Sequence, residues 1–208
     1  MSGRGRLVAL EGLDGSGKTT QAGLLAETIG ALVTAEPGAT PLGRRLRDLL
    51  LDPGSPPVAA RAEALLMAAD RAQHVAEVVV PALDAGRWVV SDRFSGSTLA
   101  YQGFGRGLAL DELRSLVTWA TGGVEPDLTV LVDVPLRVAL GRRRPEADRL
   151  ERLGDEFQER VRAGYLCLAD ADPTRWVVVD GTGDETEVAV RILNAVGDRL
   201  APLPTPAR

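Results

Sequence analysis

The chain has 208 residues, of which 45% are hydrophobic and 25% are charged, and its formal net charge is −5 at pH 7. This composition suits one α/β domain and excludes a disordered chain, and the acidic balance excludes a broad basic surface for nucleic acid. One cysteine excludes an internal disulfide and a cysteine-based metal site. Since no apolar run is long enough to cross a membrane, we expect a cytoplasmic protein.

Short apolar runs alternate with longer helical stretches, which is typical of a parallel sheet covered by helices. Pro81 should kink or end the third of these helices, and the proline-containing tail 201–208 should be frayed. In such sheets, ligands bind beyond the carboxyl ends of the strands. We expect strands over residues 7–11, 31–35, 88–92, 128–134 and 176–180, and helices over 18–29, 41–51, 58–84, 97–101, 111–121, 136–142, 151–169 and 185–200.

The strongest motif follows the first predicted strand, where residues 12–19 read GLDGSGKT and match the GxxxxGK[ST] phosphate loop, or P-loop. Its glycines let backbone N–H groups surround phosphate oxygens, and the next helix adds its positive end. We predict that Lys18, the only lysine in the chain, reaches the β- and γ-phosphates of ATP and that Thr19 binds Mg²⁺. A ligand-free turn is the alternative. The predicted ATP site comprises Gly12, Leu13, Asp14, Gly15, Ser16, Gly17, Lys18, Thr19 and Thr20.

The helix predicted over 58–84 places Met67 and Arg71 four residues apart, and therefore on one face. An apolar side chain beside an arginine could bind a planar base. A core methionine beside an exposed arginine explains the same spacing, and the spacing alone favours it. The only histidine, His74, is expected on the helix surface and not as a catalyst.

Asp92 ends the third predicted strand and is followed by Arg93. An acidic side chain at this point can hold Mg²⁺ through water, as a Walker-B carboxylate does, while Arg93 can face an acceptor phosphate. A surface ion pair is the alternative for so short a motif. The position at a strand end favours the functional interpretation.

Arginines gather after the fourth predicted strand, where residues 141–149 read GRRRPEADR. A charge run is usually a solvated helix face. Because a P-loop lies in the same chain, we favour a lid over about 141–150 that closes on the triphosphate and neutralises charge on the transferred group. The lid arginines are Arg142, Arg143, Arg144 and Arg149.

Taken together, these segments resemble those of bacterial thymidylate kinases, a family of P-loop nucleoside-monophosphate kinases, over about residues 7–195. The segment 92–103 is the most specific, because it separates this family from other monophosphate kinases. The landmarks are EGLDGSGKTTQ at 11–21, EPG at 36–38, LRDLLL at 46–51, ADRAQH at 69–74, DRFSGSTLAYQG at 92–103, PDLTVLVDV at 126–134 and DRLE at 148–151.

The resemblance implies a single P-loop kinase domain over 1–208, with a central five-stranded parallel sheet and a small mobile lid. It also implies an enzyme that transfers the γ-phosphoryl group of ATP, with Mg²⁺, to dTMP to give dTDP, and a homodimer. A kinase for another nucleoside monophosphate or a deoxynucleoside remains open. A GTP-dependent switch is nearly excluded, because Asn194, the only asparagine, is followed by Ala-Val-Gly and forms no NKxD motif.

Individual roles also follow from the resemblance. Asp14 would lie near the acceptor phosphate and the sugar 3′-hydroxyl, and Tyr101 would crowd the 2′ position against a ribonucleotide, supported by Ser97. Arg47 and Arg93 would bind the acceptor phosphate beside Glu36 and Pro37, while Arg71, Thr98 and Gln102 would contact the thymine edge. The implied catalytic set is Asp14, Lys18, Arg93, Arg142, Arg143, Arg144 and Arg149. The implied dTMP site is Asp14, Glu36, Pro37, Arg47, Met67, Arg71, Arg93, Ser97, Thr98, Tyr101 and Gln102.

The sequence departs from the family pattern at a few positions. Ala35 replaces an arginine, Ala39 replaces a glycine, and Met67 stands where phenylalanine is common, so that packing on the base would lack aromatic stacking. The lid is short and contains Pro145. Because Gly15 leaves the P-loop without an extra arginine, the resemblance implies that the lid supplies the catalytic one.

Overall fold

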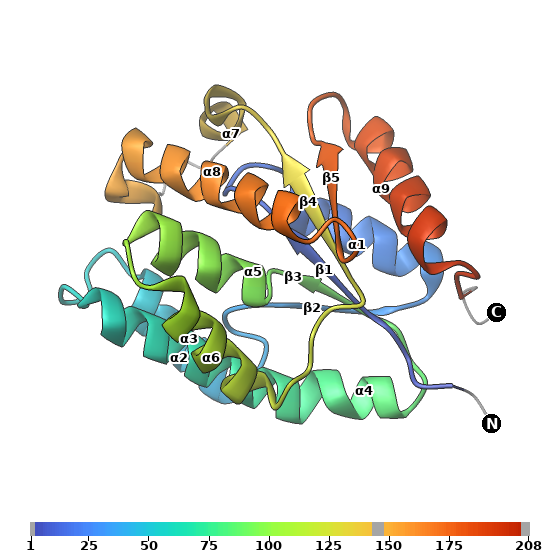
Figure 1. Cartoon of the computed structure of the whole chain (residues 1–208), viewed down its shortest axis with the longest axis horizontal. Coiled ribbons are helices and arrows are strands. Elements are labelled where there is room, and N and C mark those ends of the chain that lie inside the picture. The colour runs from blue at the N-terminus through green and yellow to red at the C-terminus, as the bar shows by residue number, and fades with distance from the viewer. Residues whose placement is uncertain (1–2, 143–147, 205–208) are drawn as a thin grey trace.

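A computed structural model describes residues 3–142 and 148–204 of the chain, and its centre is a five-stranded sheet (Figure 1). All strand pairs are parallel, in the order β2-β3-β1-β4-β5. All five residues of β1 are buried. The expected five-stranded parallel sheet is therefore confirmed. The strands are β1 (Leu7–Glu11), β2 (Leu32–Ala35), β3 (Val89–Asp92), β4 (Leu128–Asp133) and β5 (Trp176–Asp180).

Helices cover both faces of this sheet (Figure 1). Side chains of a strand alternate between faces, so Val8 and Leu10 pack with helices α1 and α9, while Leu7 and Ala9 pack with η1 and α4. The long helix α8 packs beside η2 in a third cluster near the end of β4. The helical elements are α1 (Lys18–Ile29), α2 (Pro41–Leu51), α3 (Ala60–His74), η1 (Val75–Val79), α4 (Val80–Asp84), α5 (Ser95–Thr98), η2 (Leu99–Gly105), α6 (Leu110–Thr121), α7 (Leu136–Arg142), η3 (Glu151–Leu153), α8 (Asp155–Ala171) and α9 (Glu185–Leu200).

Local signals explain the helix boundaries that the sequence predicts correctly. Helix α1 ends at Gly30, which adopts a left-handed conformation that favours glycine. Thr40 caps α2 by accepting a hydrogen bond from the backbone N–H of Gly43 at 2.9 Å. Asp184 and Glu187 form a reciprocal capping box at the start of α9.

The helix expected over 58–84 is a continuous helical run from Ala60 to Asp84, and Pro81 does not end it. Instead the run widens into the π-helical segment η1 just before Pro81, which lies in the first turn of α4. A proline ring clashes with the carbonyl four residues earlier in a regular α-helix, and it is tolerated in a first turn. The widened turn thus lets the run continue.

Two further helices differ from expectation. The helix expected over 151–169 begins at Asp155, because Gly154, with φ of 83°, separates it from the short 3₁₀ turn η3. The helix expected over 97–101 is longer: it runs from Ser95 through the π-helical segment η2 to Gly105. This extension places Tyr101 and Gln102 in the π-helical segment, which packs beside α3 and α8.

The parallel arrangement places two of the motifs side by side. In the β1–β3 pairing, Leu10 is opposite Asp92, so the P-loop and the Asp92-Arg93 segment leave neighbouring strands at the same edge. The backbone N–H of Arg93 donates to Leu10 O at 2.9 Å and extends that pairing by one residue. Carboxyl ends of parallel strands are where ligands bind in such sheets.

Candidate active site

The P-loop occupies the turn between β1 and α1, and its glycines are required by its backbone. Gly12, Gly15 and Gly17 have φ of 147°, 87° and 93°, a region that residues with a side chain rarely adopt. A Cβ on Gly15 would lie 2.2 Å from Ala139 O. The glycines therefore allow the tight turn at the start of α1 that a phosphate-binding loop requires.

Lys18 and Asp14 meet at the mouth of this loop. The buried Lys18 Nζ donates to Leu13 O and to Asp14 Oδ1, both at 3.2 Å. Asp14 also accepts from Arg93 Nη2 at 2.5 Å and from the Tyr101 hydroxyl at 2.9 Å. Burial alone would raise the pKa of Asp14, but the positive charges of Arg93 and Lys18 outweigh it and hold that pKa well below its usual range. Asp14 is therefore an ionised link between the P-loop and Arg93.

Arg93 has an unusual backbone. Its φ of 70° is the only positive value at a non-glycine residue in the described part of the chain, and such strain costs roughly 1–3 kcal/mol. The side chain also donates to Ser97 Oγ at 2.9 Å. Burial would lower the pKa of Arg93, but Asp14, together with Tyr101, Tyr165 and Asp92, outweighs burial and raises that pKa, so the guanidinium stays charged.

Glu11 stabilises this strained turn, and the sequence motifs did not single it out. Its carboxylate accepts hydrogen bonds from the backbone N–H groups of Phe94 and Ser97, both at 3.0 Å, from Ser97 Oγ at 2.6 Å and from the Tyr165 hydroxyl at 3.0 Å. Burial raises the pKa of Glu11. The only sequence signal was its place at the first residue of the EGLDG landmark.

The two predicted metal ligands lie together. Thr19 Oγ1 donates to Asp92 Oδ2 at 2.5 Å, and both Asp92 Oδ1 and Ser16 Oγ are buried without a hydrogen-bond partner in the described structure. Oxygen atoms of carboxylates and hydroxyls suit Mg²⁺, which is usually bound by few protein ligands together with substrate phosphates. These residues therefore fit the predicted ion.

A cavity opens next to the P-loop, between α2, α3, η2 and the segment at Asp148 and Leu150. All the residues predicted to contact the acceptor line it: Asp14, Glu36, Pro37, Arg47, Met67, Arg71, Arg93, Ser97, Thr98, Tyr101 and Gln102. Leu51, Asp70, Asp148 and Leu150 line it as well, and the sequence reasoning missed them.

Arg71 forms one wall of the cavity and is buried, not exposed. It donates to Glu36 Oε2 at 2.8 Å, to Thr98 Oγ1 at 2.7 Å and to Phe94 O at 2.8 Å. These bonds use three of the five N–H donors of a guanidinium. Fixed in this way, Arg71 can present its remaining donors to a ligand without losing its own orientation.

The expectation that His74 lies on the helix surface is wrong. Its side chain is fully buried, with Nδ1 2.7 Å from Glu36 Oε1 and Nε2 2.8 Å from Thr34 Oγ1. His74 follows Arg71 by three residues and so shares its inward face of α3. It supports Glu36 from behind the cavity.

Asp70 is a second acidic group of this wall. Its Oδ1 accepts a hydrogen bond from the backbone N–H of Gly38 at 3.0 Å. Burial, followed by the negative charge of Glu36, raises the pKa of Asp70 to about 6. Arg47 lies nearby and donates to Pro37 O at 2.9 Å, so the cavity end next to the EPG segment contains charges of both signs.

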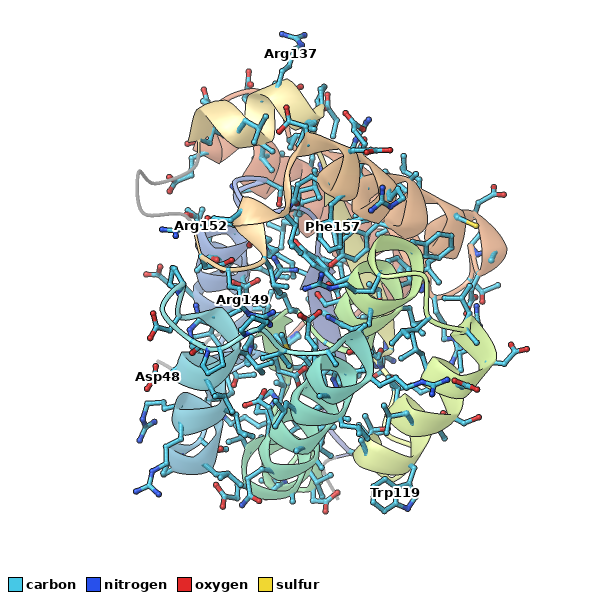
Figure 2. The ribbon with its side chains drawn as sticks, turned by 90° about the vertical axis from the view of Figure 1, so that its left-hand side faces the viewer. Asp48, Trp119, Arg137, Arg149, Arg152 and Phe157 are labelled. Carbon is cyan, nitrogen blue, oxygen red and sulfur yellow. The ribbon has the colours of Figure 1, made fainter. Side chains whose placement is uncertain are left out.

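Of the predicted lid arginines, the structure describes Arg142 and Arg149, and these two have different partners. Arg142 donates to Gly181 O at 3.0 Å and to Gly183 O at 3.2 Å, and it lines a second pocket with P-loop residues Ser16 and Gly17. Arg149 lies where the segment after Asp148 meets α2 and α3 (Figure 2). Arg143 and Arg144, like Pro145, lie outside the described residues.

Comparisons with known proteins agree with one another. A family model described as thymidylate kinase matches residues 10–192. The chain is 51% identical over 192 residues to a thymidylate kinase of Carboxydothermus hydrogenoformans, covering 89% of this chain and 93% of that protein. It is 50% identical over 208 residues to one of a Synechococcus strain, covering 97% and 98%.

A solved structure is also similar. The crystal structure of thymidylate kinase from Ehrlichia chaffeensis superposes with a TM-score of 0.76 at 30% sequence identity, covering 93% of this chain and 99% of that one. Among the described residues, no helix is both long and apolar enough to span a membrane.

Proposed function

The chain belongs to the thymidylate kinase family, and from this premise we propose that it transfers the γ-phosphoryl group of ATP to dTMP, giving ADP and dTDP. The observation that carries the proposal is that every residue expected to contact the acceptor lines one cavity beside the P-loop. A P-loop alone would suit many nucleotide-binding proteins. A P-loop with an acceptor cavity next to it, lined by the residues that the family resemblance implies, suits an enzyme with two nucleotide substrates.

The acceptor needs no general base, because a phosphate monoester is already anionic at neutral pH. Catalysis then consists of positioning and of stabilising charge on the moving group. We propose that Arg47 and Arg93 hold the acceptor phosphate, while Lys18 neutralises charge on the transferred phosphoryl group. The ion-pair chain of Lys18, Asp14 and Arg93 supports this arrangement, since it joins the donor side of the site to the acceptor side.

We propose Mg²⁺ as the metal of the reaction, held by Thr19 and, through water, by Asp92. When bound, it would neutralise charge on the donor phosphates and orient them. The unpaired Asp92 Oδ1 supports this assignment, because a buried carboxylate oxygen normally has a partner.

The second pocket supports a place for the donor nucleotide. It joins the start of α1 to the loop before α9, and it is lined by Ser16, Gly17, Thr20 and Arg142. We propose that the nucleoside part of ATP binds there, with its phosphates in the P-loop. We also propose that residues of about 141–150 form a lid that supplies a catalytic arginine, which is one of Arg142, Arg143, Arg144 and Arg149.

We further propose a cytoplasmic homodimer formed from single-domain subunits. Helices α3 and α6 pack side by side, and each exposes a large apolar side chain, Leu65 and Trp119. The Trp119 side chain is 83% exposed and points away from the molecule at the end of α6 (Figure 2). Tryptophan is enriched in subunit interfaces relative to the rest of a protein surface, and this exposed Trp119 supports the proposal.

Product analysis tests the proposed reaction. The purified protein, incubated with ATP, Mg²⁺ and dTMP, should form ADP and dTDP in equal amounts, as separated by anion-exchange chromatography. Omitting dTMP should reduce ADP release to background. ADP release without dTDP would identify a simple ATPase and would contradict the proposal.

A further inference from the structure

Glu63 of α3 is a fully buried carboxylate that accepts four hydrogen bonds. Its Oε1 accepts from Gln102 Nε2 at 3.0 Å and from Arg106 Nε at 3.2 Å. Its Oε2 accepts from Arg106 Nη2 and from Arg149 Nη2, both at 2.8 Å. Gln102 lines the acceptor cavity, whereas Glu63 lies behind it. One carboxylate therefore connects a cavity wall to two arginines.

This carboxylate is ionised. Burial would raise the pKa of Glu63, but its hydrogen bonds to Arg106 and Gln102, together with the charge of Arg106, outweigh burial and lower that pKa. An ionised carboxylate has acceptors only and no hydrogen to donate. Whatever faces Glu63 must therefore be a donor.

That requirement fixes the side-chain amide of Gln102. The orientation of a glutamine amide is set by its hydrogen-bond network, and only the NH₂ end of Gln102 can face Glu63. The amide oxygen must then point the other way across the planar group. Within the described part of the chain, no hydrogen bond uses this oxygen, and the residue lines the acceptor cavity.

We propose that Glu63 is a positioning residue that sets base specificity, by holding Gln102 with its amide oxygen directed toward the acceptor base. This inference rests on the proposed function. The N3–H of a thymine ring is a donor between two carbonyl oxygens, and it can donate to the oxygen of Gln102. Arg71, which lines the same cavity and donates to Thr98 Oγ1, has further donors that suit a thymine carbonyl.

A cytosine ring presents the opposite pattern. Its N3 is an acceptor and would face the amide oxygen of Gln102, and its exocyclic amino group would face the donors of Arg71. Leaving buried polar groups unpaired is what allows a hydrogen-bonding site to reject a close analogue. If Gln102 were reversed, its NH₂ group would instead donate to cytosine N3.

Glu63→Gln tests this directly. The new amide has one oxygen, which Arg106 and Arg149 would attract, so its NH₂ group would face Gln102 and reverse it. We expect the ratio of kcat/KM for dTMP to that for dCMP to fall at least about tenfold, with turnover of dCMP rising in absolute terms. The KM for ATP should change less than about twofold. If the role of Glu63 were purely structural, Glu63→Gln would lower kcat/KM for dTMP and for dCMP by the same factor and would raise neither value.

Three further variants make the test specific. Arg106→Lys is the matched control: it disturbs the same cluster but keeps the positive charge that holds the Glu63 carboxylate ionised, so the ratio should stay within about twofold of wild type. Glu63→Gln with Arg106→Gln removes the carboxylate together with one cation, which guards against misfolding from uncompensated charge; the ratio should fall as in the single variant. In a Gln102→Leu background, Glu63→Gln should leave the ratio unchanged.

The outcomes separate the two proposals. A wild-type enzyme without preference for dTMP over dCMP would contradict the proposed function and this inference together. A wild-type preference that survives in both Glu63 variants would overturn only the inference. An effect of Glu63→Gln that persists in the Gln102→Leu background would also overturn it, because Glu63 would then act by another route.

Discussion

Asp14 is the residue at which the two parts of the site meet. Its carboxylate contacts Lys18 of the P-loop on one side and Arg93 and Tyr101 of the acceptor cavity on the other. The two cations also keep it ionised. A substitution on the donor side can therefore affect the acceptor side through Asp14 alone, and the reverse also holds. We expect single substitutions in this cluster to reduce activity more than the size of the lost contact suggests.

Lys18 provides the first prediction at this scale. Lys18→Ala should reduce kcat by about 100-fold or more, because the ammonium stabilises the transferred group. Lys18→Arg should also be impaired, since a planar fork does not replace a compact ammonium in the buried space beside Leu13 O. Steady-state kinetics would check both, with circular dichroism to confirm folding. Near-normal activity of Lys18→Arg would contradict this account.

Asp70 gives a pH-dependent prediction. Its pKa of about 6 in the folded protein exceeds the ordinary 3.8. Between about pH 4 and 6 the folded protein holds a proton that the unfolded chain has lost, so this group makes the free energy of unfolding decrease as pH rises through that window. Asp70→Asn keeps the acceptor for Gly38 N–H and does not titrate. Its Tm relative to wild type should increase from pH 4 to pH 7, and a constant difference would be evidence against the raised pKa.

The sequence did not predict the burial and the partners of several residues of the site, because their contacts join distant parts of the chain. Glu63 contacts Arg149, 86 residues later, and His74 contacts Glu36, 38 residues earlier. Spacing within a helix shows which residues share a face, but it does not show which distant segment covers that face. His74 was therefore expected on the surface although it is buried, and the spacing of Met67 and Arg71 alone favoured an exposed arginine where Arg71 is buried.

At the scale of elements, the turn from β3 into α5 is the least tolerant part of the site. A Cβ on Gly96 would lie 2.7 Å from the ring of Trp176 and 2.9 Å from Glu11 Oε1, and that carboxylate is itself fixed by four hydrogen bonds. The same turn contains the strained Arg93. Its geometry thus depends on close contacts among three strands and their following segments.

Gly96→Ala should consequently lower stability by about 1–3 kcal/mol, as is usual for overpacking. Gly23→Ala is a matched control, since a Cβ there meets nothing within 4 Å and alanine favours the helix. Thermal denaturation should show a lower Tm for the first variant and an equal or higher Tm for the second. Equal Tm values for both variants would refute the close packing at Gly96.

The elements themselves were largely predictable. Helices α1, α2, α7 and α9 have the expected bounds, because glycine, proline and capping residues mark their ends. The differences arise where a special conformation intervenes: Gly154 delays the start of α8, and η1 carries the helix past Pro81. The two π-helical segments have 5 and 7 residues, too few for a hydrophobic period to distinguish them from an α-helix.

At the scale of the whole molecule, the order of the strands decides where the site lies. With β1 between β3 and β4, the P-loop lies next to Asp92-Arg93 on one side, and α3 and η2 enclose the cavity beside it. The sequence predicted the sheet and the cluster of motifs at its carboxyl edge. The sequence did not predict the second pocket or the part that Asp148 and Leu150 play in lining the acceptor cavity, because both depend on the three-dimensional arrangement.

Substrate preference tests the central claim, that this cavity binds dTMP for phosphorylation, most directly. ADP release by the wild-type protein should be measured with MgATP and, in turn, dTMP, dUMP, dCMP, dGMP and thymidine. We predict the highest kcat/KM for dTMP, a lower value for dUMP, much lower values for dCMP and dGMP, and no turnover of thymidine, which lacks the phosphate that Arg47 and Arg93 would hold. Comparable turnover of the monophosphates, or preferred turnover of thymidine, would contradict the account.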